Sequence, residues 1–202
     1  MLRPGRSSDA AALASLDAGE RAVLGESSPG WHITAAGDPA KVHLVLDDGA
    51  GPAGYLVLAA PRGPEPGVEL HRLVVAAARR RAGLGRALLH TALRLTGASR
   101  APERREPRDL PAGAGRDDGA PLSDALERDA RRVPPLDDAL GPDAHWAPPG
   151  WLAAGRIWLE VAPDNATALR LYRSAGLDVE TRLPSVPGDP DSPPLRLVLS
   201  RG

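Results

Sequence analysis

The stretch VELHRLVVAAARRRAGLGRALLHTALRL, from Val68 to Leu95, decides the fold. Its first eight residues, Val68 to Val75, end in β-branched side chains and predict a buried strand. Its last part places leucines at the spacing of one helical face, which predicts an amphipathic helix. A short glycine-containing turn, Arg80 to Gly85, joins the two. The stretch therefore predicts a strand, a tight turn and a helix in direct succession.

The turn has the features of an anion-binding site. A helix that opens on such a turn points free backbone N–H groups outward at the positive end of its dipole. Glycine leaves the backbone accessible to a phosphate group, because it has no side chain. The third glycine of a dinucleotide fingerprint is missing, and so is the Gly-Lys-Ser/Thr of a P-loop. The adjacent arginines are either a nucleic-acid patch or the surroundings of a phosphate ligand; they are Arg79, Arg80, Arg81 and Arg86.

Two blocks of the sequence together carry a resemblance to a known family. The form Arg-x-x-Gly-x-Gly after a strand, at Arg80 to Gly85, resembles the pyrophosphate-binding motif of the GNAT superfamily of acyl-CoA-dependent N-acyltransferases. Asn165-Ala-Thr-Ala-Leu-Arg-Leu-Tyr172-Arg-Ser-Ala-Gly176-Leu177 resembles its N-x-x-A-x-x-L-Y-x-x-x-G-F block, with Leu177 in place of Phe. The chain is identified as a member on these two blocks. The resemblance implies an α/β (α+β) fold, with a central mixed, mostly antiparallel sheet that is flanked by helices and splayed between its two central strands.

The remaining elements are predicted from patterning and turn residues. A helix follows the cap Ser8-Asp9, and another runs from Ala166 to Ala175 with Gly176 after it. Glu26 to His32 is predicted to be a loop, and the second helix that the family usually has before Lys41 is expected to be reduced or missing. Further strands are predicted at 2–4, 41–46, 54–59, 156–161, 178–183 and 195–199, the last two as an antiparallel pair joined by a proline-rich loop.

The whole chain, 1–202, is expected to be one domain with an insertion at about 98–150. That segment is rich in proline and charge and poor in large apolar residues, so it cannot bury enough surface to offset chain entropy. Disorder is the main prediction, with a marginal helix at Ser123 to Val133; a lid or a partner-binding arm is the alternative.

Composition sets the remaining bounds. The 202 residues have a formal net charge of -1, which gives no global reason for nucleic acid or an anionic membrane as partner. The sequence has no cysteine, no apolar signal core and no membrane span, which is typical of a cytoplasmic protein. A homodimer is left open.

The resemblance implies acetyl-CoA as co-substrate, with no metal. The backbone of Leu73, Val74 and Val75 would pair with the pantetheine amides like an added strand, and a strand N–H would polarise the thioester carbonyl. Asn165 would bond to the cofactor or the splayed strand, act as an ordinary helix N-cap, or do both. The pyrophosphate would lie on the turn and the start of the helix, at Arg80, Arg81, Ala82, Gly83, Leu84, Gly85 and Arg86.

The resemblance also implies the catalytic candidates. Tyr172 is the family's general acid, which protonates the departing thiolate; the alternative is an aromatic core residue. Glu69 matches a position that often acts as base, directly or through a water; the alternative is a solvated or ion-paired strand residue. His71 shares the face of Glu69 by strand alternation and is the second candidate, since histidine ionises nearest to neutral pH. Glu160 is the third.

The predicted function is an N-acetyltransferase. It would move an acetyl group from acetyl-CoA to a primary amine, on a small molecule or at a protein N-terminus, by direct transfer in a ternary complex. The alternative is a non-catalytic acyl-CoA-binding sensor or scaffold, which the reduced second helix and the insertion would favour. Release of thiol from acetyl-CoA in the presence of amines would distinguish the two.

Overall fold

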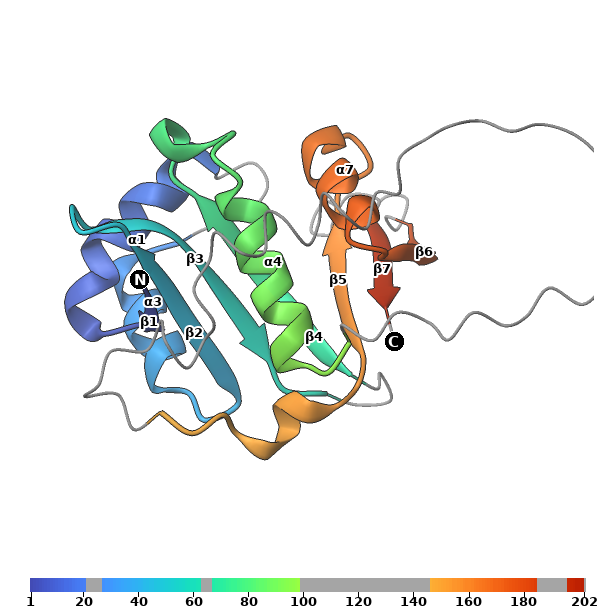
Figure 1. Ribbon diagram of the computed structural model, residues 1–202, viewed down its shortest axis with the longest axis horizontal. Coiled ribbons are helices and arrows are strands. Elements are labelled where there is room, and N and C mark those ends of the chain that lie inside the picture. The colour runs from blue at the N-terminus through green and yellow to red at the C-terminus, as the bar shows by residue number, and fades with distance from the viewer. Residues whose placement is uncertain (21–26, 63–66, 99–145, 185–195, 202) are drawn as a thin grey trace, which may run out of the picture.

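The computed structural model describes residues 1–20, 27–62, 67–98, 146–184 and 196–201. Seven strands form one sheet in the order β1-β2-β3-β4-β5-β7-β6 (Figure 1). Every neighbouring pair is antiparallel except β4–β5, which is parallel, so the sheet is mixed and mostly antiparallel as predicted. The strands are β1 (Leu2–Pro4), β2 (Lys41–Asp47), β3 (Pro52–Ala59), β4 (Val68–Val75), β5 (Ile157–Val161), β6 (Asp178–Leu183) and β7 (Arg196–Arg201).

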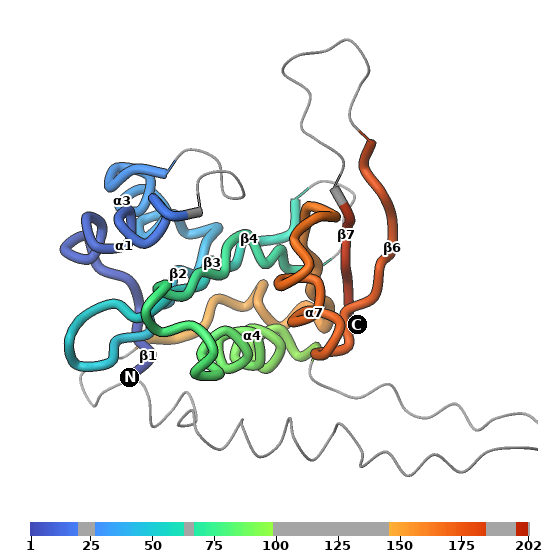
Figure 2. Tube along the Cα trace, turned by 90° about the horizontal axis from the view of Figure 1, so that it is seen from above, coloured from blue at the N-terminus to red at the C-terminus, as the bar shows by residue number. Residues whose placement is uncertain are grey.

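Helices cover both faces of this sheet. Helices α1 (Ala10–Asp17) and α3 (Pro29–Gly37) lie on one side, and α4 (Leu84–Leu95) lies on the other (Figure 2). Helix α7 (Ala166–Ser174) follows β5 and contributes Leu169 to the same apolar core as α4. The fold is therefore three-layered around the central strands.

The two sides of the sheet have cores of different size. The core on the α4 side is extensive and includes Leu56, Leu88, Ile157 and Leu177. The core on the α1 side is smaller, and its buried residues are Leu13, Val45, Tyr55, Val57 and Val74. Buried polar side chains from α1, α3 and the sheet also lie on the α1 side, so one face of β4 packs against polar groups.

Helix α3 corrects the prediction that the second helix is reduced or missing. The segment Ser28-Pro-Gly-Trp31 reads as a loop because proline and glycine usually mark turns. In the structure Ser28 is the N-cap, with its Oγ accepting a hydrogen bond from the N–H of Trp31 at 3.2 Å. Proline is favoured in the first helical position, where its missing N–H costs nothing. The residues read as a loop are thus the start of a nine-residue helix.

The predicted insertion at about 98–150 lies mostly outside the described residues, and so do the predicted helix at Ser123 to Val133 and most of the proline-rich loop between β6 and β7. Its two described ends are held by the fold. Ala98 is fully buried, and Trp146 packs against the α4-side core. None of the helices in the described part of the chain is long and apolar enough to cross a membrane.

Candidate active site

The central strands β4 and β5 part soon after they meet. They are paired only at Val68–Ile157 and Glu69–Trp158. Beyond that point β4 continues alongside β3, and β5 continues alongside β7. The edge of β4 that carries Leu73 to Val75 is therefore not bonded to β5, which confirms the predicted splay. A strand edge of this kind offers backbone N–H and C=O groups to an extended ligand.

A bulge interrupts β4 at His71. On β3, Leu58 pairs with Leu70 and Val57 pairs with Arg72, so His71 is an extra residue without a partner in the β3 register. A bulge of this kind bends the strand and re-aims a side chain. It was not predicted, because a register shift depends on the partner strand and leaves no mark in the sequence of β4 alone.

The bulge changes which side chains share a face. Before it, Val68 and Leu70 face the α4-side core; after it, Leu73 and Val75 do so as well. Val74 packs in the α1-side core instead. Strict alternation would have placed Leu73 and Val75 on the face of Glu69 and His71, so the bulge separates the predicted cofactor-pairing residues from the predicted bases.

Glu69 and His71 lie on the same side of β4, as predicted. His71 Nδ1 is 2.8 Å from Glu69 Oε1, and both side chains are partly exposed. The His71 ring also stacks on the indole of Trp31, with the ring centroids 6.0 Å apart and the planes at 16°. Trp31, on α3, was missed by the sequence analysis because the helix that carries it was not expected.

A buried polar cluster lies behind Trp31, on the α1 side of the sheet. Asp17, only 1% exposed, is its centre, and Arg72 donates to its carboxylate from 3.0 Å. The Arg72 guanidinium also lies 3.8 Å from the Trp31 ring centroid. Asp17 further accepts from Ser27 and Tyr55 and contacts Nε2 of His32 at 3.1 Å. Burial is the largest single effect and raises the Asp17 pKa, but the hydrogen bonds with His32, Ser27 and Tyr55 together lower it below its ordinary value.

The predicted phosphate turn has the expected geometry. Helix α4 begins at Leu84, and its N-cap residue Gly83 has a φ of 80° and offers no side chain to the first turn. A Cβ on Gly83 would meet no protein atom within 4 Å, so the turn opens outward. Arg81, also with positive φ, precedes it, and Arg80 Nε donates to the carbonyl of Val75 at 3.3 Å. The free backbone N–H groups in the first turn of α4 form a site suited to an anion.

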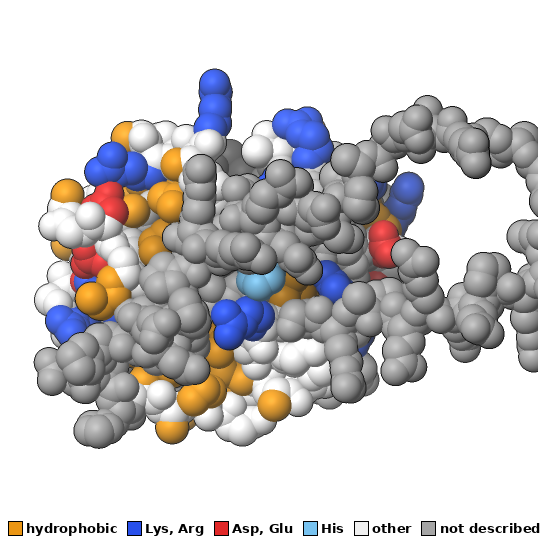
Figure 3. Space-filling view, viewed as in Figure 1, with side chains coloured by type: hydrophobic (Ala, Val, Ile, Leu, Met, Phe, Trp, Pro, Cys, Tyr) orange, Lys and Arg blue, Asp and Glu red, His pale blue; other side chains and the backbone are white. Residues whose placement is uncertain are grey.

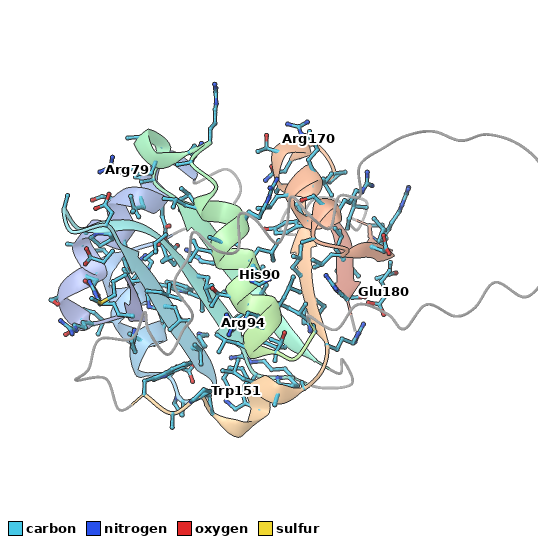
Figure 4. The ribbon with its side chains drawn as sticks, viewed as in Figure 1. Arg79, His90, Arg94, Trp151, Arg170 and Glu180 are labelled. Carbon is cyan, nitrogen blue, oxygen red and sulfur yellow. The ribbon has the colours of Figure 1, made fainter. Side chains whose placement is uncertain are left out.

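The second sequence block lies beside this turn. A Cβ placed on Gly85 would be 3.6 Å from Leu171 of α7, so the two blocks approach closely. Figure 4 shows Arg79, on the turn, and Arg170, on α7, at the same end of the molecule, with His90 and Arg94 further along α4. Basic side chains project over this end in Figure 3 as well. The charge there suits a phosphate-bearing ligand.

Asn165 and Tyr172, both in the second block, differ in the hydrogen bonds that their side chains form. Asn165 is the N-cap of α7, and its Oδ1 accepts from the N–H of Ala168 at 3.1 Å. The Tyr172 hydroxyl has no hydrogen bond to any described residue, and burial of the side chain raises its pKa to about 12. Asn165 is thus used at least as a helix cap, whereas the Tyr172 hydroxyl has no structural partner in the described part of the chain.

Arg79 and Glu160 complete the set of candidates. Arg79 forms an ion pair with Asp48 at 2.7 Å, and Glu160 is exposed on β5. Within the described ranges no group of three or more histidine, aspartate or glutamate side chains is arranged to hold a metal ion.

The comparison with known families decides what the fold and these blocks mean. The model of the acetyltransferase (GNAT) family matches residues 13–104, from α1 past the end of α4. Residues 13–104 are therefore assigned to the GNAT acetyltransferase family. As a GNAT acetyltransferase it uses acetyl-CoA, and the unpaired β4 edge and the uncapped start of α4 suit the pantetheine and pyrophosphate of that molecule. No curated protein is a significant match to the chain.

Solved structures share the GNAT fold at low identity. The ribosomal-protein-S18-alanine N-acetyltransferase from Escherichia coli is 17% identical, with a TM-score of 0.55 over 99% of this chain and 91% of that one. Arabidopsis thaliana NAA60, in complex with a bisubstrate analogue, is 13% identical, with a TM-score of 0.59 over 99% and 95%. The putative acetyltransferase yncA from Salmonella typhimurium, with acetyl-CoA, is 17% identical, with a TM-score of 0.52 over 99% and 91%.

Proposed function

We propose that this GNAT protein moves the acetyl group of acetyl-CoA to a primary amine, on a small molecule or at a protein N-terminus, by direct transfer within a ternary complex. The observation that supports the proposal is that the open turn before α4 approaches two elements at Gly85: the end of β4 that is not paired with β5, through Leu73 and Val75, and α7, through Leu171. Leu171 directly precedes the proposed acid, Tyr172.

The binding of acetyl-CoA follows from the open turn and the end of β4 that is not paired with β5. The pantetheine amides pair with the backbone of Leu73, Val74 and Val75, and one strand N–H polarises the thioester carbonyl. The pyrophosphate lies on the backbone N–H groups at the start of α4, where the helix dipole and the arginines of the turn favour negative charge. Gly83 leaves room for the pyrophosphate, because a Cβ added to Gly83 would have no protein atom within 4 Å.

The transfer step uses one acid and one base. The acceptor reaches the site as an ammonium ion and must lose a proton before its nitrogen can attack; Glu69, His71, Glu160 or a water is the base. The nitrogen then attacks the thioester carbon, so that a C–N bond forms as the C–S bond breaks. The sulfur leaves with the electron pair and takes the phenolic proton of Tyr172. The phenolate recovers a proton from the acylated nitrogen, and one proton in total passes to solvent.

The acceptor class rests on chemistry shared by structural neighbours. Their names specify a ribosomal-protein alanine, spermidine and an aminoglycoside, all of which present a primary amine. We place the reaction in the cytoplasm, in keeping with a sequence that has no cysteine. The non-catalytic alternative loses one of its two supports, because α3 occupies the position of the helix that was expected to be reduced.

Thiol release from acetyl-CoA tests the proposal. The protein is incubated with acetyl-CoA and, in turn, spermidine, kanamycin and a peptide that begins with alanine, and free thiol is measured against a no-amine blank. We expect amine-dependent release with at least one acceptor, and mass spectrometry should find the acetylated amine. Binding of acetyl-CoA by calorimetry without turnover of any amine would instead favour the non-catalytic alternative.

A further inference from the structure

The contacts of His71 point to one assignment among the candidate bases. Its Nδ1 is bonded to Glu69 Oε1 at 2.8 Å, and a carboxylate can only accept a hydrogen bond. The proton of the neutral ring must therefore be on Nδ1, which leaves the lone pair on Nε2. Nε2 has no hydrogen bond to any described residue. The side chain is 35% exposed, so the ring is partly accessible to a substrate or to water.

The ring of His71 is held in place from a second direction. Trp31 stacks against it, with the planes within 16° of parallel. Trp31 is in turn covered by the Arg72 guanidinium at 3.8 Å, and Arg72 is anchored to the buried carboxylate of Asp17. A bond to the Glu69 carboxylate and a stack against an anchored indole together restrict both the tilt and the rotation of the imidazole.

We propose that His71 is the general base of the transfer and that Glu69 is a positioning residue that acts through it. The assignment rests on the proposed function. Nε2 takes a proton from the acceptor ammonium, the imidazolium is stabilised by the Glu69 carboxylate, and the exposed ring passes the proton to solvent. A base hydrogen-bonded to an orienting carboxylate is the arrangement that nucleophile-activating sites use repeatedly.

Two arguments favour His71 over direct action by Glu69. The facing oxygen of Glu69 is already occupied by His71 Nδ1, and its side chain is less exposed than that of His71. A general base is most efficient when its pKa lies near the working pH, and imidazole is the side-chain class that meets this condition without perturbation. Among the described residues, the titratable and charged groups that contact the His71–Trp31 pair are Glu69, Arg72, Lys41 and His32.

Three glutamine variants test the assignment with an amine that the parent turns over in the thiol-release panel. In His71→Gln the affinity for acetyl-CoA should stay as in the parent, while kcat/KM for the amine falls about 100-fold or more near pH 7. The loss should shrink as the pH rises toward the pKa of the amine itself, and added imidazole should restore part of the rate. His90→Gln, the same substitution on α4, should behave like the parent.

Glu69→Gln distinguishes a positioning role from a direct one. The amide oxygen still accepts from Nδ1 but carries no charge, so we expect a smaller loss, about tenfold, and an acid limb of kcat/KM that remains. If Glu69→Gln removes that limb and His71→Gln keeps the parent rate, Glu69 is the direct base and the assignment is wrong. Equal rates in the parent and His71→Gln, with chemistry rate-limiting, would also overturn it.

The tautomer gives a test that needs no acceptor. Nitrogen-15 shifts of the His71 ring, measured in the parent above the pH where the ring is protonated, should report N–H at Nδ1 and a lone pair at Nε2. The opposite tautomer overturns the assignment even if no amine is found. Failure of the proposed function is a separate result, since it appears as a parent that binds acetyl-CoA and acetylates none of the panel.

Discussion

The hydroxyl of Tyr172 is a polar group in an apolar setting. Desolvation raises its pKa to about 12, and it bonds to no described side chain or carbonyl. The side chain is partly buried against the α4-side core, and its hydroxyl remains able to donate a hydrogen bond to a ligand. The raised pKa also keeps the phenol protonated throughout the neutral range, as an acid must be.

Tyr172→Phe should therefore lower kcat about 100-fold or more while leaving acetyl-CoA affinity and ring packing nearly unchanged. In the parent, no basic limb from Tyr172 is expected below about pH 10, because its proton leaves only near pH 12. The control is Tyr55→Phe, at the only other tyrosine, which loses a bond to buried Asp17 and should lower the free energy of unfolding instead. An unchanged kcat in Tyr172→Phe, with chemistry rate-limiting, would assign the proton to another group.

His43 makes the stability of the protein depend on pH. Burial, followed by the nearby His32, lowers its pKa to about 4, and neither ring nitrogen has a hydrogen bond within the described residues. The unfolded chain, with an ordinary histidine near pH 6.5, binds the proton first as the pH falls. Stability should thus be flat above about pH 6.5, fall between 6.5 and 4, and lose about 2 kcal/mol by pH 5 from this group.

Urea unfolding of the parent and of His43→Leu at pH 7 and pH 5 measures this effect. The substituted side chain cannot titrate, so the difference between the two pH values should shrink in the variant whatever its absolute stability. The same pH difference in both proteins would place the acid sensitivity on other residues.

At the scale of elements, the sequence predicted what depends on local patterning. The bounds of β4 and β6 were found as predicted, and so was the start of α7, because alternation, apolar spacing and capping residues are local signals. Helix α3 and the bulge at His71 were missed. Helix α3 begins with Ser-Pro-Gly, which is typical both of a turn and of a helix N-terminus. The bulge is a property of the pairing between β3 and β4.

Gly83→Val tests the turn before α4. The valine side chain would project into the space that we assign to the pyrophosphate, so acetyl-CoA should bind more than tenfold more weakly, a loss above ~1.4 kcal/mol. Positive φ itself costs a β-branched residue roughly 1–2 kcal/mol of stability. Gly155→Val is the matched control, since Gly155 also has a positive φ of 72° and open space around its Cβ direction.

Gly155 lies beyond the other end of α4, where its N–H donates to the carbonyl of Thr96. Both variants should lose comparable stability, but only Gly83→Val should lose affinity in calorimetry. Equal affinity in the two variants, each folded by circular dichroism, would remove the pyrophosphate from this turn.

At the scale of the whole molecule, the candidate site depends on contacts between distant segments. The two motif blocks could be predicted to meet, because both resemble parts of one cofactor site. The contact of Trp31 with His71 could not, since it joins α3 to a bulge in β4 and neither was expected. The surroundings of the proposed base are thus the part that required the structure.

The final prediction concerns the segment from Arg100 to Pro149, most of which lies outside the described residues. We propose that the chain is one domain and that this segment is dispensable for its folding. The fold holds the two ends of the segment independently of it: Ala98 and Leu152 are buried, and the N–H of Gly155 bonds to the carbonyl of Thr96 at 2.8 Å. A short Gly/Ser linker can join ends that are held in this way. The entropic cost of closing a loop depends only weakly on its length, so shortening the loop should change the free energy of unfolding little.

Replacement of 100–149 by such a linker should preserve a single cooperative unfolding transition. It removes Trp146, which packs against the α4-side core, so the loss in free energy of unfolding should match that of Trp146→Ala in the full chain. A replacement that fails to fold while Trp146→Ala folds would mean that other residues of the segment belong to the core. A replacement that folds and binds acetyl-CoA but no longer turns over its amine would assign the segment to the acceptor, because the residues proposed to bind the cofactor are all retained.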